Sequence, residues 1–318
     1  MQAITSEAYR FDTPAQTQTK SQPQPQPQPR NRTDTPRWSP PRGRILHRAL
    51  CHDPASEYYC YAPASSKEGS RVLVVIHGIS GRALDYAQLF APYCEDRGVV
   101  LLVPHFAEHH RDFQRLGRQG RGPRADEILH QCLSEVGSLT GANIGQAYLF
   151  GYSAGAQFVH RYVMAHPNRV ARAVVVAAGW YTFPDAEQRF PYGIRPTRKL
   201  PGVRFTPEEF LKVPVAVFVG AEDLGSMNLR TTARVNHQQG ANRVERARHW
   251  VRAMRKAART YRLPALTSYT EVPGISHDFD EFSRNGALAS RVVLALFGEL
   301  PAEAGSAKQP AKNGEGTA

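Results

Sequence analysis

Short apolar segments alternate with longer amphipathic segments along most of the chain. Runs rich in valine and leucine, without the apolar–polar alternation of a half-exposed strand, cover residues 72–76, 99–103, 147–150, 173–177 and 215–219. Strands that are covered on both faces have this composition. Helical spacing of apolar residues marks other segments, at 82–97, 124–139, 154–166, 241–262 and 280–298. The alternation predicts an α/β fold with a mostly parallel sheet and helices on both faces.

Three other segments fit the same prediction. Residues 43–50 and 57–62 are expected to form an antiparallel hairpin at one edge of the sheet, and residues near 266–272 to form its last strand. Residues 180–212 break the alternation with several prolines and aromatic residues. We expect this segment to be a long excursion over one end of the sheet.

Both ends of the chain are polar, unlike its centre. Residues 1–44 contain the run QPQPQPQPR, in which each proline fixes φ and removes a backbone donor, and residues 301–318 are small and polar. Neither end has enough apolar residues to offset the entropy of ordering it. We expect a disordered arm over 1–44, one domain over 45–300 and a disordered tail over 301–318.

The formal net charge of +12 raises the question of a nucleic-acid partner. The basic excess lies mainly in residues 1–44 and 240–262, rather than along a continuous groove. The second segment also has an apolar stripe from Val244 to Tyr261, which favours an outer helix with solvated charges. The alternative is a basic face for an anionic membrane or a nucleic acid. We favour the outer helix and expect no nucleic-acid partner.

Other large-scale features narrow the class of protein. No apolar run approaches the roughly 18 residues of a membrane-spanning helix, and the first 30 residues have no apolar signal-peptide core. We therefore expect no integral membrane association and a cytoplasmic location. The cysteines form no CxxC pair, which indicates reduced thiols, although two of them are close enough to pair in an exported protein: Cys51 and Cys60.

The most specific motif is Gly151-Tyr152-Ser153-Ala154-Gly155. It follows a predicted buried strand and opens a predicted helix, which is the context in which GxSxG forms a nucleophile elbow. A serine on such a turn has strained backbone angles, and the glycines leave room for the strand-to-helix crossing. We expect Ser153 Oγ to lie above the sheet edge, beside the N-terminus of the helix.

A serine nucleophile needs a base and a carboxylate that orients the base. His277 lies between the last predicted strand and the last predicted helix, and Glu222 and Asp223 follow the strand 215–219. Open α/β sheets build their sites at these carboxyl ends. We expect His277 as the base and Asp223 as the acid, because a short carboxylate one residue further from the strand points back more readily. Glu222 is the alternative acid, and Asp185 is the third candidate.

A tetrahedral intermediate needs backbone N–H donors aimed at its oxyanion. The N–H of Ala154, directly after the serine, is one expected donor. Ile79 is expected to supply the other, because Gly78 lets the chain turn tightly after the apolar run 72–76. His77 is expected to be structural, with hydrogen bonds inside its loop.

Together these motifs resemble the α/β-hydrolase fold. The resemblance rests on VLVVIHG, GYSAG, the acid after VAVFVG, and GISHDF, and it covers about residues 57–298. Within that superfamily the chain is similar to the polyhydroxybutyrate depolymerase-like and feruloyl-esterase-like branch, through YAPASSKEGSRVLVVIHGISG, LFGYSAGAQFVHRYVMAHPNRV and VVVAAGWYTFP. The resemblance implies a serine hydrolase that acts on esters. The missing signal peptide is a departure, since polymer-degrading members are usually exported.

Two further clusters are candidates for binding sites. Trp180, Tyr181 and Phe183 follow the strand 173–177 and are expected to line a substrate pocket; packing of the excursion onto the sheet is the alternative, and the two are compatible. The pair His109-His110 has a spacing that turns metal ligands apart. We expect no metal site and no cofactor.

Two hypotheses follow. The first is a serine esterase that cleaves a small-molecule ester, either a short hydroxyacyl or an aromatic ester, through an acyl-enzyme intermediate. The second is a catalytically idle hydrolase-like scaffold whose proline-rich arm and basic helix bind an acidic partner. The presence of all three triad residues favours the first. The pattern leaves the oligomeric state open.

Overall fold

The computed structural model describes residues 41–106, 112–117 and 122–299. Residue contacts divide the chain into two units, residues 1–38 and 39–318, and the fold below is that of the second unit. The disorder expected of the arm and the tail falls on residues 1–40 and 301–318, outside the described residues. The His109-His110 pair also lies outside them.

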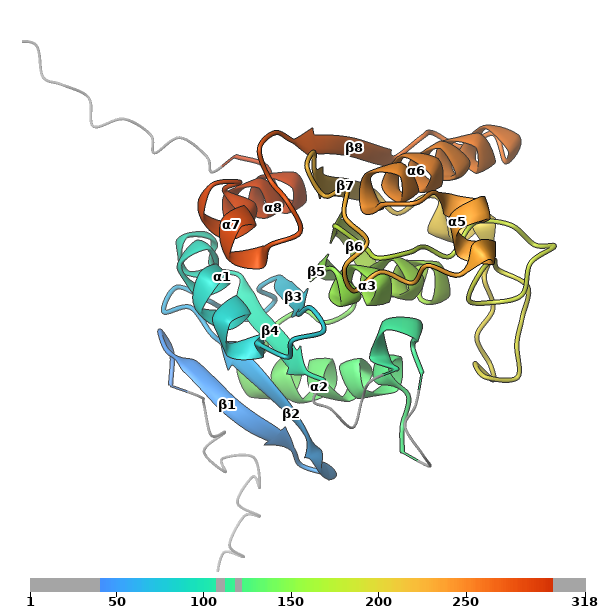
Figure 1. Cartoon of the computed structure of the whole chain (residues 1–318). Coiled ribbons are helices and arrows are strands. Elements are labelled where there is room, and N and C mark those ends of the chain that lie inside the picture. The colour runs from blue at the N-terminus through green and yellow to red at the C-terminus, as the bar shows by residue number, and fades with distance from the viewer. Residues whose placement is uncertain (1–40, 107–111, 118–121, 300–318) are drawn as a thin grey trace, which may run out of the picture. The chain divides into compact units, whose positions relative to one another are not determined.

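The centre of the fold is an eight-stranded sheet with the order β1-β2-β4-β3-β5-β6-β7-β8 (Figure 1). Strand β2 is antiparallel to β1 and β4, and the other neighbours pair in parallel. This confirms the mostly parallel sheet and the antiparallel hairpin at its edge. The strands are β1 (Ile45–Leu50), β2 (Asp53–Tyr61), β3 (Val72–Ile76), β4 (Val100–His105), β5 (Ala147–Tyr152), β6 (Val170–Val176), β7 (Val215–Gly220) and β8 (Thr267–Val272).

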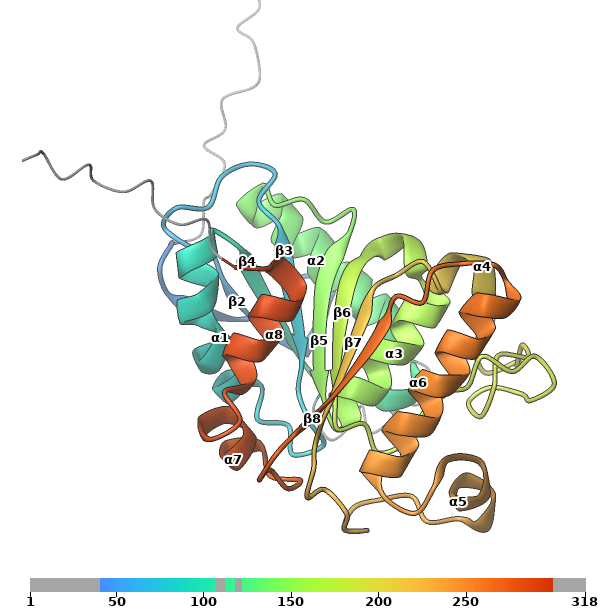
Figure 2. The same cartoon turned by 90° about the horizontal axis from the view of Figure 1, so that it is seen from above.

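Helices cover both faces of the sheet (Figure 2). Side chains alternate along each strand, so Val72, Val74 and Ile76 of β3 join the core cluster that includes residues of α2, α3 and α6, and Leu73 and Val75 join the cluster that includes residues of α1 and α8. This explains the continuous apolar runs. The helices are α1 (Ala83–Arg97), α2 (Ala125–Thr140), α3 (Ala154–Ala165), α4 (Pro207–Phe210), α5 (Ala233–Gln239), α6 (Arg243–Thr260), α7 (Phe279–Arg284) and α8 (Leu288–Phe297), with 3₁₀ turns at Phe113–Arg115 and Pro167–Arg169.

The C-terminal helical segment differs from the expectation. One helix was predicted over 280–298, but the structure has α7 and α8 in its place. The chain turns between them at Ala287, which has a left-handed φ of 48°. A side chain at the preceding Gly286 would lie 2.5 Å from the Phe282 ring, so that close approach requires glycine.

The basic helix α6 buries more charge than its pattern suggests. Its apolar stripe faces the core as expected, except that Tyr261 follows the helix and is 41% exposed. Arg243 and Arg246 are also buried. Two of the charges that were expected on a solvated face therefore lie inside the protein.

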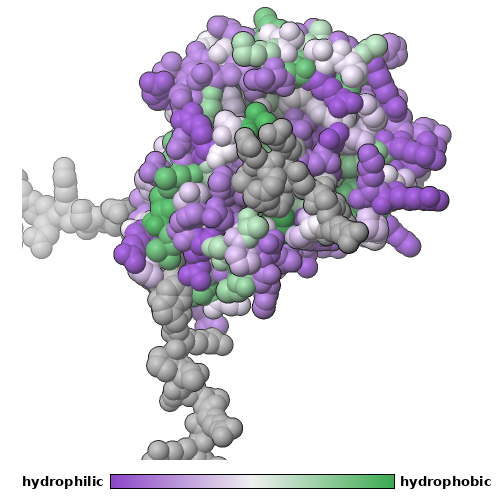
Figure 3. Space-filling view, turned by 60° about the horizontal axis from the view of Figure 1, so that its bottom comes forward, coloured by the Kyte–Doolittle hydropathy of each residue, from purple (hydrophilic) through white to green (hydrophobic). Residues whose placement is uncertain are grey.

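The face shown in Figure 3 is largely hydrophilic, and its apolar residues form small separate groups. None of the helices in the described ranges is long and apolar enough to cross a membrane.

Candidate active site

Ser153 occupies a tight turn between β5 and α3. Its backbone angles are φ 52° and ψ −108°, a strained conformation for a residue with a side chain. A side chain at Gly155 would lie 2.0 Å from the Ile76 carbonyl oxygen, and one at Gly151 would lie 2.3 Å from the Gly155 carbonyl oxygen. The two glycines are therefore required by the close crossing of β5, α3 and β3, as the motif predicted.

The turn brings Ser153 to a histidine from the other end of the chain. Ser153 Oγ lies 3.1 Å from His277 Nε2, and His277 Nδ1 lies 2.8 Å from Asp223 Oδ2. His277 follows β8, and Asp223 follows β7. Three residues at the carboxyl ends of three strands thus form one hydrogen-bonded chain.

The structure distinguishes the three candidate acids by position. Asp223 is 1% exposed and contacts His277, whereas the adjacent Glu222 is exposed. Asp185 accepts hydrogen bonds from the Glu187 backbone and the Gln188 side chain, within the excursion. Of the three, Asp223 is the carboxylate that contacts the imidazole.

A buried arginine that the sequence did not single out also contacts Asp223. Arg243, in the first turn of α6, donates from Nη1 to Asp223 Oδ1 over 3.1 Å and from Nη2 to the Met227 carbonyl over 2.9 Å. Its side chain is 2% exposed. Asp223 is thus held on one oxygen by His277 and on the other by Arg243, which fixes the plane of its carboxylate.

Tyr152 packs against the histidine from beside the serine. Its ring is stacked on His277 at a centroid distance of 5.5 Å and an interplanar angle of 14°. Burial raises the pKa of its phenol, so the ring next to the imidazole is neutral. Tyr152, the residue before the serine in the GxSxG motif, therefore orients the imidazole of His277 by stacking.

The two expected oxyanion donors lie at the ends of β5 and β3. The Ala154 N–H is the first of α3, where helix geometry leaves no internal acceptor. The N–H of Gly78, the residue before Ile79, donates to the Tyr86 hydroxyl over 3.2 Å, so this N–H already has an acceptor. The side chain of Ile79 is 58% exposed. The assignment of Ala154 and Ile79 as donors stays a proposal.

His77 lies inside the loop that carries Ile79. Its Nε2 accepts the Phe106 N–H over 3.0 Å, so Nδ1 carries the proton and donates to the Gly78 carbonyl over 2.6 Å. The ring has no exposed surface, and burial lowers its pKa to about 4. His77 is therefore neutral and structural, as expected.

With this geometry in place, the chain can be compared with known proteins. No family model and no curated protein matches it. A poly(3-hydroxybutyrate) depolymerase structure from Bordetella parapertussis is 25% identical, with a TM-score of 0.65 over 82% of this chain and 91% of that one. Poly(aspartic acid) hydrolase-1 from Sphingomonas sp. KT-1 is 26% identical, with a TM-score of 0.62 over 73% of this chain and 91% of that one. This chain has the α/β-hydrolase fold.

The remaining similarities agree with the branch named from the motifs. A ferulic acid esterase structure shares the fold at 13% identity, with a TM-score of 0.54 over 80% of this chain and 98% of that one. The α/β-hydrolase fold is confirmed, and so is the resemblance to depolymerase-like proteins, while the ferulic acid esterase structure adds to the evidence for the fold.

The expected aromatic pocket needs a correction. Trp180 lines a hollow of about 130 Å³, which we call the Trp180 hollow. Tyr181 has no exposed surface and stacks on Trp250, and Phe183 packs against the core cluster without lining the hollow. Only Trp180 of the three aromatics is in position to contact a ligand there. The hollow is lined by Gln114, Arg115, Gln157, Gly179, Trp180, Asn228 and Arg230.

The Trp180 hollow is lined in part by the helix that follows Ser153 and by the segment that follows β6. The Gln157 N–H donates to the Ser153 carbonyl over 3.1 Å, one helical turn along α3. The Ser153 N–H donates to the Val176 carbonyl over 2.9 Å, four residues before Trp180. Two walls of the hollow therefore begin at residues bonded to the serine backbone.

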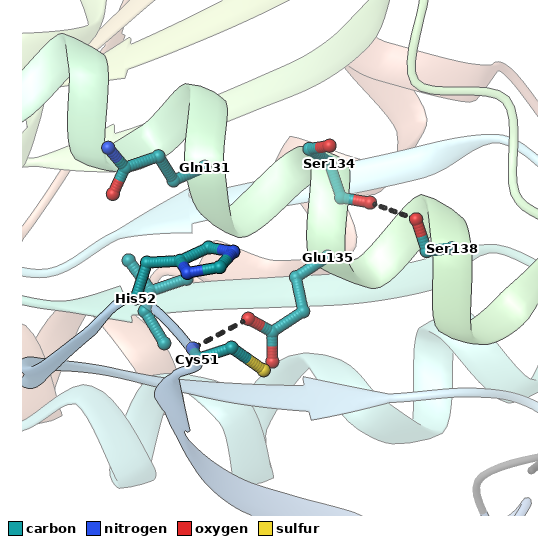
Figure 4. A pocket seen from close by; sticks show the side chains of 7 residues that line it. Cys51, His52, Gln131, Ser134, Glu135 and Ser138 are labelled. Carbon is teal, nitrogen blue, oxygen red and sulfur yellow. Dashed lines mark hydrogen bonds between the residues drawn. The ribbon is translucent and has the colours of Figure 1, made fainter. Parts of the chain in front are cut away.

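A second hollow lies at the β1–β2 turn, against α2 (Figure 4). It is about 340 Å³ and is lined by Leu50, Cys51, His52, Gln131, Ser134, Glu135 and Ser138; we call it the Glu135 hollow. Glu135 accepts hydrogen bonds from the Cys51 backbone N–H at 3.1 Å and the Tyr58 hydroxyl at 2.8 Å. Burial opposes its ionisation, but these bonds outweigh burial and lower its pKa.

The cysteines and possible metal ligands complete the survey. Cys51, Cys60, Cys94 and Cys132 are all free thiols. Among the described residues, no three His, Cys, Asp or Glu side chains are grouped to hold a metal ion.

Proposed function

We propose that this chain is a serine hydrolase that cleaves carboxylic esters, with Ser153 as nucleophile, His277 as general base and Asp223 as the orienting acid. The observation that carries the proposal is the continuous hydrogen-bond chain, 3.1 Å from Ser153 Oγ to His277 and 2.8 Å from His277 to Asp223. Both distances lie in the range that nucleophile activation requires. The 25% and 26% identical depolymerase and hydrolase structures support the same chemistry.

We propose one step for each residue. Ser153 Oγ attacks the ester carbonyl carbon while its proton passes to His277 Nε2. The imidazolium then protonates the leaving alkoxide, and an acyl-serine remains. Water repeats the sequence: it loses a proton to His277, attacks the acyl carbon and releases the carboxylic acid, and the proton returns to Ser153.

The charges of the transition state have matching groups. Asp223 stabilises the imidazolium and fixes the tautomer that presents Nε2 to the serine. We propose the N–H groups of Ala154 and Ile79 as the oxyanion donors. Such preorganised donors supply a large part of the rate enhancement in acyl transfer.

We propose a short ester as substrate. The Trp180 hollow beside Ser153 has a volume of only about 130 Å³ and mostly polar walls. Each added methylene contributes about 0.8 kcal/mol only where it is buried against apolar surface. We therefore propose short hydroxyacyl esters, and an aromatic ester finds a single aromatic wall in Trp180.

Chain length is tested by measuring kcat/KM for p-nitrophenyl esters from two to sixteen acyl carbons. We expect a maximum among the shortest chains. A steady rise to the longest chain would contradict the short-ester proposal, while leaving the serine mechanism intact.

The mechanism itself is tested with a fluorophosphonate probe, which labels an activated serine covalently. We expect the wild-type protein to be labelled. The control variant Ser138→Ala should also be labelled, because Ser138 donates to the Ser134 carbonyl on α2 and lies at the Glu135 hollow. Ser153→Ala should not be labelled. Labelling of folded Ser153→Ala, or none of the wild type, would overturn the proposal.

A further inference from the structure

The Trp180 hollow has a one-sided charge. Arg115 and Arg230 line it together with the amides of Gln114, Gln157 and Asn228, and none of its described lining residues is acidic. Arg115 pairs with Asp112, which neutralises part of its charge, and Arg230 reaches the Tyr192 hydroxyl at 3.5 Å. The exposed Arg230 is therefore a cation with a neutral partner at the mouth of the hollow.

A third arginine lies directly beneath. Arg161 on α3 has no exposed surface, and it contacts three lining residues: Gln114, Gln157 and Trp180. Its other side-chain partner is the neutral hydroxyl of Thr182, and no ion pair joins it to a carboxylate in the described ranges. Its Nη2 is buried without a hydrogen-bond partner. A buried guanidinium without an ion-pair partner is costly, so an anion bound at this hollow would stabilise it.

The pKa of Arg161 agrees with an anion site at the Trp180 hollow. Burial lowers the pKa of Arg161 to about 9, and the positive charge of Arg115 acts in the same direction. The negative charge of Asp112 acts in the opposite direction, and a bound anion would act in the same direction as Asp112.

The walls of the hollow are held in place before any ligand binds. The Trp180 ring lies near both cations, 4.5 Å from the Arg161 guanidinium carbon and 5.4 Å from that of Arg230. The buried Arg246 donates to the Gly179 carbonyl over 2.6 Å and to the Arg230 carbonyl over 2.9 Å, so it ties the two walls together. A preorganised site loses little entropy when its ligand binds.

We propose that the Trp180 hollow binds a carboxylate of the substrate, so that the preferred substrate is an ester that carries a free carboxylate near the scissile bond. Arginine donors suit a carboxylate because of their fork geometry. The volume of about 130 Å³ admits such a compact group. This inference rests on the proposed function, since the carboxylate is recognised next to Ser153.

The test compares isosteric esters. Monomethyl succinate, glutarate and adipate carry a carboxylate, and their primary-amide analogues replace only that group. The pair 4-acetoxybenzoate and 4-acetoxybenzamide places the same change on the alcohol side. We expect kcat/KM for the best acid to exceed that of its amide by about tenfold or more, as charge-assisted hydrogen bonds allow. An equal rate for acid and amide in every pair would overturn the inference.

Two variants make the test specific. Arg230→Gln should reduce the acid-to-amide ratio to near one, whereas Arg252→Gln, an exposed arginine of α6 that does not line the hollow, should leave it unchanged. A ratio that survives Arg230→Gln, or falls equally in Arg252→Gln, would assign the preference to the overall positive charge and contradict this site.

Binding separates this inference from the proposed function. Isothermal titration of Ser153→Ala with the monomethyl esters measures carboxylate recognition without turnover. Binding that is lost on adding Arg230→Gln supports the site even if the wild type cleaves no ester, and that result would overturn only the proposed function. Cleavage of p-nitrophenyl acetate without binding or preference for any acid would overturn only the carboxylate site.

Discussion

The Ser153 site and the Glu135 hollow contain the same kinds of side chain in different relations. One has a serine, a histidine and a carboxylate joined by hydrogen bonds of 3.1 and 2.8 Å. The other has Cys51, His52 and Glu135 around a space of about 340 Å³, which is larger than the Trp180 hollow. There, however, Glu135 accepts a hydrogen bond from the backbone N–H of Cys51, and no hydrogen bond joins the His52 ring to either residue in the described structure.

The difference shows that connection, and not composition or volume, makes a set of residues reactive. A nucleophile is activated when a base reaches its proton and an acid orients the base. At the Ser153 site three strand ends hold these groups in line. At the Glu135 hollow the carboxylate is already occupied by Tyr58 and the Cys51 backbone. We therefore expect reactivity at the first site alone.

The largest expected effect tests this contrast directly. Ser153→Ala should lower the turnover of p-nitrophenyl acetate by about 10⁵–10⁶, because a triad acts as one unit. Cys51→Ala should retain full turnover, since no hydrogen bond joins a histidine ring to Cys51 in the described structure. Both are checked by steady-state kinetics on protein whose fold is verified by circular dichroism. An active Ser153→Ala or an inactive Cys51→Ala would reverse the comparison.

The second test concerns the acid. Asp223→Asn should cost about 10⁴ in kcat, as removal of the orienting carboxylate does in serine proteases. The adjacent Glu222→Gln should change kcat by no more than a few fold, because that side chain is exposed. If the glutamine variant were the inactive one, the acid would be Glu222.

The third test removes the buried partner of Asp223. Arg243→Met leaves one side of a buried carboxylate unpaired and should lower the free energy of unfolding by about 3–5 kcal/mol. The matched control on the same helix is Arg248→Met, whose pair with Glu271 is about half exposed and should contribute about 0–1 kcal/mol. Urea denaturation measures both. Equal stabilities would show that Arg243 is not needed to hold Asp223.

The smallest expected effect is a pH dependence of stability near Ser153. His77 has a folded pKa of about 4 because it is buried, against roughly 6.5 when unfolded. Between these two pKa values the unfolded chain binds more protons than the folded protein does. The free energy of unfolding therefore falls as the pH drops, by up to about 1.4 kcal/mol per pH unit for such a histidine. The slope of unfolding free energy between pH 6.5 and 4 should flatten in His77→Gln.

The control for this measurement comes from the Glu135 hollow. His52 is exposed, so His52→Gln should keep the wild-type slope. Burial also lowers the pKa of His130 to about 4 and that of His160, so part of the slope remains in His77→Gln. An unchanged slope in His77→Gln would mean that His77 is accessible to protons in the folded protein.

Much of the site could be predicted from the sequence, because the motifs that mark it are local. Gly151 and Gly155 mark the tight turn, Asp223 comes shortly after the apolar run 215–219, and His277 lies in the loop after the last predicted strand. Arg243 gave no such signal, because an arginine in the first turn of a basic helix looks the same whether it is solvated or buried. Tyr181 and Phe183 were misplaced because aromatic neighbours in an irregular segment can face different sides. Trp180 contacts arginines at the hollow, while Tyr181 stacks on Trp250 in the core.

The sequence by itself determined the order of the strands, the elbow at Ser153 and the pair of acids that follow β7. These depend on periodicity and on steric limits over a few residues. Only the tertiary structure decided which acid meets His277, that three arginines lie buried around the site, and that His52 makes no hydrogen bond to Cys51 or Glu135 in the described structure. Such relations depend on how elements far apart in the chain pack, and no spacing along the chain records that packing.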